Sequence, residues 1–240
     1  KSQRNPLLTT TLGTGEMIKV ALDHGVTKII IGLGGSVTND AGAGMAQALG
    51  AKFYDIDGGE VAVGGGQLKQ IHQIDLSALD ARLKQVEIMI ASDVNNPLCG
   101  EQGASSVFGA QKGATPDMVK QLDQNLSHFA DLVEQQCGLD LRNVAGAGAA
   151  GGLAFALMAF AGVKLRSGVE LMIEQTQLAE KIAQADYVFT GEGGIDFQTK
   201  FGKTPFGVAQ VAKRLNKPVI ACAGYVGEDI ESILTRLLQV

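Results

Sequence analysis

Short apolar runs that alternate with helical stretches constrain the fold of this chain more than any other feature. Four such runs have the length of β-strands, and they cover residues 28–33, 86–91, 187–190 and 218–223. The first of them, Lys28-Ile29-Ile30-Ile31-Gly32-Leu33, is typical of a strand that is buried on both faces. Because the order of strand, glycine turn and helix repeats, the sequence predicts an α/β fold with a mostly parallel sheet and flanking helices.

Helix ends and turns are marked by residues with known preferences. Thr14 is expected to cap the first helix, which Gly25 closes. The longest helix is predicted to begin at Thr115-Pro116 and to stop before Gly138. Asp57-Gly58 predicts a hairpin turn between the two short strand-like runs that flank it.

The composition and the charge exclude several classes of partner. The chain has a net charge of −5 and no Lys/Arg-rich block, so nucleic acid and anionic membranes are poor partners. Residues 144–163 carry no charge, but they are mostly Ala and Gly. We therefore expect a glycine-rich loop that runs into a buried helix there, and no membrane span.

The three cysteines, Cys99, Cys137 and Cys222, are odd in number and widely spaced. This spacing favours neither a disulfide framework nor a zinc site. A reducing, cytoplasmic location is therefore expected.

Glycine-rich or polar turns with acidic residues follow three of the predicted strands, at residues 34–40, 92–98 and 191–196. In open α/β sheets, ligands bind beyond the carboxyl ends of the strands. Glycine loops at helix starts expose backbone N–H groups, which suit phosphate or carboxylate, and neighbouring carboxylates suit magnesium. A fourth glycine cluster, at residues 146–152, also opens a helix.

Each cluster alone has a simpler explanation, because a glycine after a strand is often only a turn and Asp40 could serve as a helix cap. The combination of clusters favours an anion site. The chain holds no GxxxxGK[ST] P-loop, and residues 32–35 do not form a GxGxxG fingerprint in register, so a Rossmann dehydrogenase is not supported.

Long motifs stand in a fixed order along essentially the whole chain. They comprise residues 4–7 with 14–16, 31–44, 93–98 with 103–104, 108–115, 146–152, 191–196 with 198–199, and 202–205 with 207–209. Together these motifs resemble those of the bacterial glycerate kinase family, of the glycerate 2-kinase/3-kinase type. The resemblance implies an enzyme that transfers the γ-phosphoryl group of ATP to a hydroxyl of D-glycerate with Mg²⁺.

The resemblance also implies a domain organisation. The family has two α/β domains with Rossmann- or flavodoxin-like βα units, one of them built from both ends of the chain. We expect residues 1–175 to form a central glycerate-kinase-like domain and residues 176–240 to form part of a second, Rossmann-like domain. The chain begins at Lys1 and lacks the family's Asp-Ser-Phe-Lys and Asp-Gly-Gly-Glu-Gly motifs. We therefore expect it to be truncated at both ends, folded and catalytically poor.

Site residues follow from the resemblance and from the strand-end positions. Asp93 and Asp196 are expected to act as general base and metal ligand, in an order that the sequence leaves open. Glu192 and Asp40 rank second, and Lys200 and Lys203 are expected to attract the anionic substrates. Residues expected to bind substrate or phosphate oxygens are Gly34, Gly35, Ser36, Thr38, Asn39 and Asn95; weaker cationic candidates are Lys112 and Arg166.

Two alternatives stay open at this point. The first is a non-catalytic module that binds a carboxylate or a nucleotide through the same glycine loops. The second is an oligomerising structural fragment. The expected partners are D-glycerate, ATP and, as a possibility, further copies of the same chain.

Overall fold

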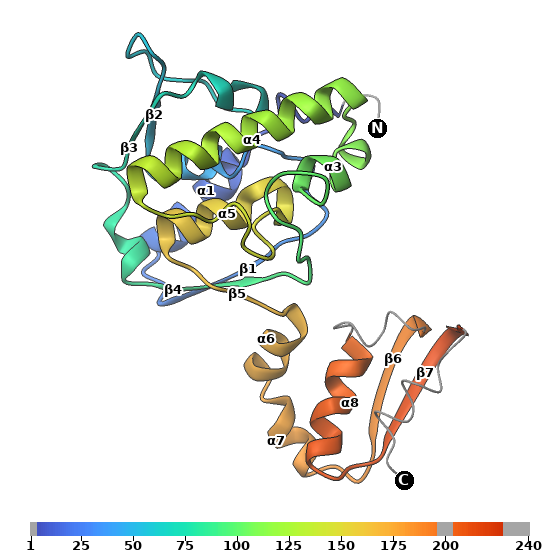
Figure 1. The fold of residues 1–240 in the computed structure, drawn as a ribbon. Helices are drawn as coiled ribbons and strands as arrows, with labels where there is room; N and C mark the ends of the chain where they lie inside the picture. Colours follow the sequence, from blue (N-terminus) through green and yellow to red (C-terminus); the bar gives the residue numbers. More distant parts are fainter. Residues whose placement is uncertain (1–3, 196–203, 228–240) are drawn as a thin grey trace. The chain divides into compact units, whose positions relative to one another are not determined.

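The computed structural model describes residues 4–195 and 204–227. The chain divides into two compact units, Lys1–Leu165 and Arg166–Val240, which Figure 1 shows as ribbons. The predicted domain boundary after residue 175 concerns the family's domains and stays a prediction. Both units mix helices with strands, so the α/β fold class is confirmed.

A three-stranded sheet in the order β1-β4-β5 organises the first unit. Its strands are β1 (Lys28–Gly32), β4 (Glu87–Ala91) and β5 (Leu165–Arg166). β1 and β4 are parallel, in a register that runs from Lys28 opposite Glu87 to Gly32 opposite Ala91. The helices α1 (Leu12–Asp23) and α5 (Ala149–Ala161) lie on the same side of this sheet (Figure 1).

The prediction that β1 is buried on both faces is wrong. Ile29 and Ile31 are half-buried and pack against the core, whereas Ile30 is 45% exposed. Ile30 is exposed because the helices α1 and α5 cover only one face of the sheet, and because β1 is an edge strand among the described strands. An apolar run of this length does not reveal how many of its faces are covered.

The longest helix, α4 (Pro116–Cys137), is confirmed with both of its predicted ends. The Thr115 side chain accepts a hydrogen bond from the Met118 N–H at 3.3 Å, and Gly138 ends the helix with a φ of 70°. Phe129 of this helix packs against Phe53, with their ring centroids 5.4 Å apart. The helix α4 therefore packs on the same hydrophobic core as α5.

Shorter elements complete the first unit. They are α2 (Ala43–Ala48), β2 (Lys52–Tyr54), η1 (Gly65–Gln70), β3 (Gln73–Asp75), η2 (Ala81–Lys84), α3 (Ala104–Phe108) and η3 (Ala110–Lys112). The turn at Asp57-Gly58 is confirmed, since Tyr54 bridges Glu60 across it. The second strand that was predicted there is wrong: β2 takes β3 as its antiparallel partner. A turn sequence determines where the chain reverses, but tertiary packing decides which strand pairs with β2.

The second unit contains the helices α6 (Gly168–Gln175), α7 (Leu178–Ala183) and α8 (Thr204–Arg214) and the parallel strands β6 (Val188–Ile195) and β7 (Val219–Val226). The predicted strands are confirmed, but the predicted glycine turn after Thr190 is wrong, because β6 continues to Ile195. Gly191 lies opposite Cys222, where a Cβ atom would come within 2.9 Å of the Cys222 carbonyl oxygen. These glycines therefore allow close strand pairing.

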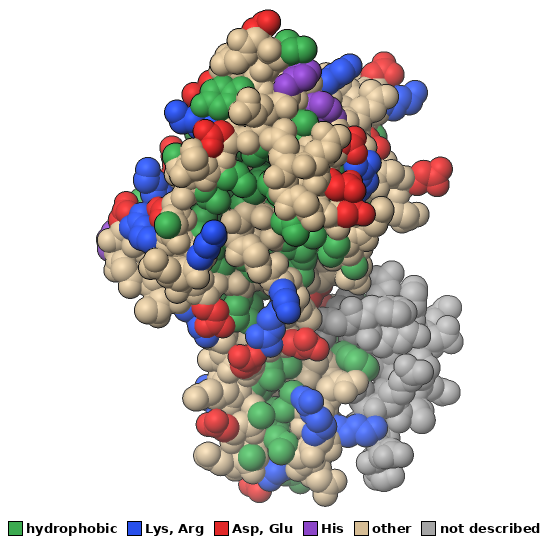
Figure 2. Space-filling view, turned by 60° about the vertical axis from the view of Figure 1, so that its left-hand side comes forward, with side chains coloured by type: hydrophobic (Ala, Val, Ile, Leu, Met, Phe, Trp, Pro, Cys, Tyr) green, Lys and Arg blue, Asp and Glu red, His purple; other side chains and the backbone are tan. Residues whose placement is uncertain are grey.

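Apolar side chains reach the surface in both units (Figure 2). The exposed ones include Ile30 of β1, Phe189 of β6 and Tyr225 of β7. The apolar stretch at residues 144–163 forms a glycine-rich loop that runs into the buried helix α5, as predicted. Within the described ranges, no helix combines the length and the apolarity that crossing a bilayer requires.

Candidate functional site

Two loops leave the sheet side by side in the first unit. Gly32 and Ala91, the last residues of the parallel strands β1 and β4, lie opposite each other. The Leu33 N–H then donates to the Ala91 carbonyl oxygen at 2.9 Å. Residues 34–40 and 92–98 therefore start from the same edge, which is where ligands bind in open α/β sheets.

The glycine cluster at residues 146–152 packs against both loops. Gly148 donates to the Asn96 carbonyl oxygen at 3.0 Å, and Ala41 donates to the Gly151 carbonyl oxygen at 3.0 Å. A Cβ atom at Gly151 would lie 2.0 Å from the Thr38 carbonyl oxygen. The amides of Gly148, Gly151 and Gly152 are already hydrogen-bonded within the protein, so these three glycines serve close backbone packing.

Backbone donors are left over along the first loop. In the part of the chain that the structure describes, no backbone N–H of residues 34–40 donates a hydrogen bond. Gly34 and Gly35 are exposed, Ser36 and Thr38 are half-buried, and Asn39 is buried. A run of unpaired N–H groups that begins at the surface is suited to an anion.

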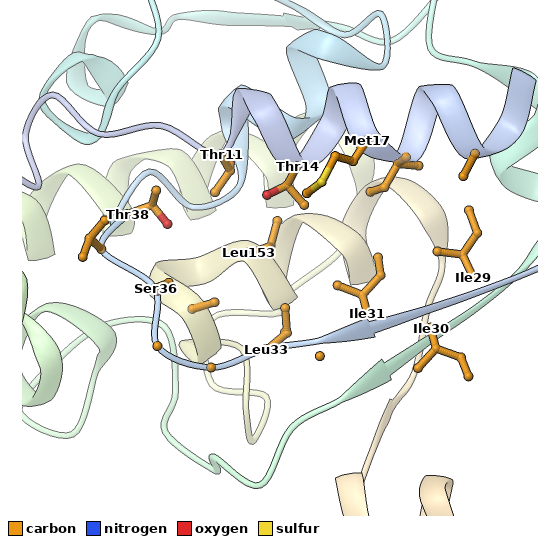
Figure 3. A pocket seen from close by; sticks show the side chains of 17 residues that line it. Thr11, Thr14, Met17, Ile29, Ile30, Ile31, Leu33, Ser36, Thr38 and Leu153 are labelled. Carbon is orange, nitrogen blue, oxygen red and sulfur yellow. The ribbon is translucent and has the colours of Figure 1, made fainter. Parts of the chain in front are cut away.

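A cavity of about 530 Å³ adjoins this loop (Figure 3). Ile31 and Leu33 point into it from the end of β1, and Thr14 and Met17 point into it from α1. Its remaining lining residues include Gly34, Gly35, Ser36, Thr38, Ala150 and Leu153. The cavity thus has apolar walls and the glycine loop at one end.

Asp40 lies at the starts of two helices, α1 and α2. Its Oδ2 atom accepts hydrogen bonds from the Thr11 N–H at 2.8 Å, the Thr11 hydroxyl at 2.9 Å and the Thr10 hydroxyl at 3.2 Å. The N–H groups of Gly42 and Gly44 also donate to its carboxylate. Burial raises the pKa of Asp40, and the hydrogen bonds from Thr11 oppose that shift.

This arrangement corrects the prediction that Thr14 caps the first helix. The helix begins earlier, at Leu12, with Thr11 at its cap position. The Thr11 N–H is satisfied by Asp40, which lies 29 residues away in the sequence. A cap that comes from so far along the chain leaves no local signal.

Replacing Asp40 with asparagine is expected to lower the free energy of unfolding by about 2 kcal/mol, because an amide group would place a donor against N–H donors. Urea denaturation of the two proteins measures the difference. Asp57→Asn, in an exposed turn, is the matched control and should stay within ~0.5 kcal/mol of the unaltered chain. Equal losses in the two variants would show that Asp40 is not a structural anchor.

A second buried polar group lies behind the same loop. The Lys112 Nζ atom donates to the Thr38 carbonyl oxygen at 2.7 Å, and the Asn39 amide donates to the Ser105 hydroxyl at 2.8 Å. Burial lowers the pKa of Lys112 to about 8, against a smaller opposing effect of the Asp40 charge. The Asn39 Oδ1 atom is buried and has no hydrogen-bond partner among the described residues.

The other predicted site residues are distributed over the chain. Asp93 and Asn95 lie exposed in the loop after β4, beside the start of the glycine loop. Glu192 lies on β6 in the second unit, and its Oε2 atom is buried without a hydrogen-bond partner among the described residues. Arg166 is bound to Glu174 at 2.6 Å. Asp196, Lys200 and Lys203 lie outside the described residues.

The structure reveals anchoring residues that the sequence reasoning missed or ranked low. Thr10, Thr11 and Ser105 hold Asp40 and Asn39, and Lys112 holds Thr38. The run Thr9-Thr10-Thr11 before the first helix was a visible signal, since hydroxyl residues gather at helix starts. No feature of the neighbouring sequence indicates that Ser105 accepts a hydrogen bond from Asn39.

Parallel strands that end in a loop with unpaired N–H groups define an α/β protein whose strand-end loop is suited to an anion. The chain belongs to the glycerate kinase family: the sequence model described as "Glycerate kinase family" matches residues 1–239. It is similar to the "Glycerate kinase" of Haemophilus influenzae, at 54% identity over 96% of this chain and 61% of that protein. It is also similar to the "Glycerate 2-kinase" of Escherichia coli, at 53% identity over 95% of this chain and 60% of that protein.

A solved structure has the same fold. The crystal structure of "putative glycerate kinase 2" from Salmonella typhimurium LT2 matches with a TM-score of 0.87 and 49% identity, over 98% of this chain and 67% of that one. The chain spans about three fifths of the length of the curated relatives named above.

Proposed function

We propose that this chain takes part in the ATP-dependent phosphorylation of D-glycerate, with the first unit supplying the anion-binding loop of the enzyme. The observation that carries this proposal is the run of unpaired backbone N–H groups at residues 34–40. Membership of the glycerate kinase family supports the choice of reaction, because glycerate and ATP both present anionic oxygen atoms.

The reaction is an in-line transfer of the γ-phosphoryl group to a hydroxyl of glycerate. Such transfers depend mainly on positioning and on neutralising negative charge. The exposed amides of Gly34 and Gly35 would hold a phosphate or carboxylate group, since no side chain blocks the approach to the backbone there. The hydroxyls of Ser36 and Thr38 would orient the oxygen atoms of the same group.

Asp93 is proposed as the general base that accepts the proton from the glycerate hydroxyl. It lies exposed in the neighbouring strand-end loop, which is where an incoming substrate can reach it. Asn95, two residues further on, would donate a hydrogen bond to substrate oxygens. Asp196, Glu192, Lys200 and Lys203 stay predictions as the remaining groups of the site.

Magnesium is part of the same proposal. Magnesium usually takes one or two carboxylates and completes its coordination with phosphate oxygens and water. The described residues hold no group of three His, Cys, Asp or Glu side chains that could bind a metal on their own. With Asp93 as the base, Asp196 would be the carboxylate ligand, and with the two roles exchanged Asp93 would hold the ion; in either case the ion would neutralise charge on the transferring phosphoryl group.

Glycerate-dependent release of ADP tests the proposed function. The coupled assay is run with this 240-residue chain and with a chain extended to the length of the curated relatives. Phosphorus NMR of the product then shows which hydroxyl is phosphorylated, which the E. coli relative's name suggests is the 2-hydroxyl. Binding of ATP or glycerate in calorimetry without turnover in either chain would instead favour a non-catalytic binding module.

Replacing Gly34 with alanine is expected to weaken the binding of the anionic substrate at least ~10-fold, with little loss of stability, because the methyl group would occupy the space that the ligand needs. A Cβ atom at Gly34 meets nothing within 4 Å in the unliganded protein. Calorimetry measures the affinity, and thermal unfolding measures the stability. Gly13→Ala, on the exposed side of α1 and equally open, is the matched control.

Gly34 is a better test position than its neighbour Gly35. Gly35 has a φ of 62°, so any side chain there would strain the backbone whether or not a ligand binds. Unchanged affinity in Gly34→Ala would assign the loop to a plain turn.

A further inference from the structure

Lys112, at the end of η3, is unusual for a lysine because it is only 3% exposed. Burying an ammonium group is costly unless it is paired. The next residue, Gly113, has a φ of 94°, and a Cβ atom there would lie 2.6 Å from the Arg4 carbonyl oxygen. The N-terminal segment therefore lies against this turn.

The ammonium group holds the glycine loop from behind. Lys112 Nζ donates to the Thr38 carbonyl oxygen at 2.7 Å, across 74 positions of sequence. The Thr9 hydroxyl donates in the same way to the Val37 carbonyl oxygen at 2.8 Å. Two successive carbonyl groups of the loop are thus bound by side chains from other segments.

These two bonds fix the direction of the N–H groups that follow. In a trans peptide the C=O and the next N–H point in opposite directions. A carbonyl that is held toward Lys112 therefore turns the Asn39 N–H away from the lysine, and Thr9 does the same for the Thr38 N–H. These are two of the N–H groups that have no acceptor among the described residues.

We propose that Lys112 is a positioning residue, which fixes the buried Thr38–Asn39 peptide and so anchors the inner end of the loop whose exposed N–H groups, those of Gly34 and Gly35, face an anionic substrate. This inference rests on the proposed function. Lys112 is enclosed by the protein, and it acts through the Thr38 carbonyl group. The charged groups around it are the Asp40 carboxylate on the loop side and Arg4 on the N-terminal segment, whose guanidinium donates to the Gln111 carbonyl oxygen at 3.1 Å.

Lys112→Met is the main test variant, because it keeps the apolar stem and removes the charge and the donor. Lys112→Gln, which keeps a donor, is the second variant. Phe53→Leu, in the aromatic core of the same unit, is the control for a loss of stability away from the loop. Amide hydrogen exchange is measured over residues 33–41, and kcat/KM for glycerate is measured in the chain of full family length.

The inference predicts at least ~10-fold faster exchange of the buried amides of residues 39–41 in Lys112→Met, with no such change in Phe53→Leu at matched stability. It also predicts at least a ~10-fold loss of kcat/KM, carried mainly by KM. Equal exchange in Lys112→Met and the unaltered chain, or an equal increase in Phe53→Leu, would overturn it. Lys112→Gln is expected to fall between the two.

The pH dependence gives a readout that a merely structural lysine would not share. Because burial lowers the pKa of Lys112 to about 8, kcat/KM of the unaltered chain should fall as the pH rises through about 8, and Lys112→Met should lack this step. The free energy of unfolding should change in the opposite sense. Between about pH 8 and 10.5 the lysine is protonated in the unfolded chain but neutral in the folded one, because its pKa is about 8 in the folded chain and 10.5 in the unfolded chain. The contribution of Lys112 to stability therefore rises with pH across that window.

The two proposals fail in different ways. Absence of glycerate-dependent ADP release from the unaltered full-length chain would reject the proposed function and leave the exchange experiment to decide on Lys112. Normal turnover together with unchanged exchange and an unchanged pH profile in Lys112→Met would reject the role of Lys112 and leave the proposed function intact.

Discussion

Alanine at position 151 is expected to lower the free energy of unfolding of the first unit by at least ~3 kcal/mol. Two effects combine there. Gly151 has a φ of 70°, which costs a residue with a side chain about 1 kcal/mol. In addition, the Cβ atom would lie 2.0 Å from the Thr38 carbonyl oxygen, and a backbone atom cannot move aside as a flexible side chain can.

A matched glycine separates these two effects. Gly138, after α4, has the same φ of 70°, but a Cβ atom there meets nothing within 4 Å. Gly138→Ala should therefore cost only about 1 kcal/mol in urea denaturation, which is the conformational part alone. If Gly151→Ala costs no more than Gly138→Ala, the close packing of α5 against the glycine loop is not what stabilises this unit.

Asp93→Asn is expected to lower kcat at least ~10²-fold in a chain of full family length, since that is the usual scale of lost general-base assistance. Because Asp93 is exposed, the thermal unfolding temperature should change little. Steady-state rates of ADP release measure the effect, and Asp57→Asn, at an exposed aspartate outside the two strand-end loops at residues 34–40 and 92–98, is the control.

Two results would remove Asp93 from the proposed mechanism. One is a turnover close to that of the unaltered enzyme. The other is normal turnover with a clear loss of stability, which would make Asp93 a structural residue of its loop.

The elements that the sequence predicted correctly are those with local causes. Thr115 and Pro116 begin α4 and Gly138 ends it because each acts on its own neighbours. The parallel pairing of β1 with β4 follows from two apolar runs separated by helical segments. By contrast, the exposure of Ile30 depends on which elements cover the sheet, and the strand conformation of Gly191 depends on its pairing with Cys222.

The candidate site divides in the same way. The residue types of the glycine loop predict an anion site, and the parallel register brings the Asp93 loop beside it. The anchoring residues could not be predicted from sequence patterns, because each lies far along the chain from the residue that it holds. The donor to Asp40 is 29 residues away, the acceptor of Asn39 is 66 residues away and the donor to Thr38 is 74 residues away. Separations of this size are a property of the fold.

The uneven anchoring of the glycine loop has a consequence for the entropy of ligand binding. Residues 37–40 are held by Thr9, Lys112, Ser105 and Thr11 before any ligand arrives. Ordering one backbone residue costs about 1–2 kcal/mol, and glycine loses more freedom than other residues. Folding has therefore already ordered residues 37–40, and the cost that is left for binding an anion falls on Gly34, Gly35 and Ser36.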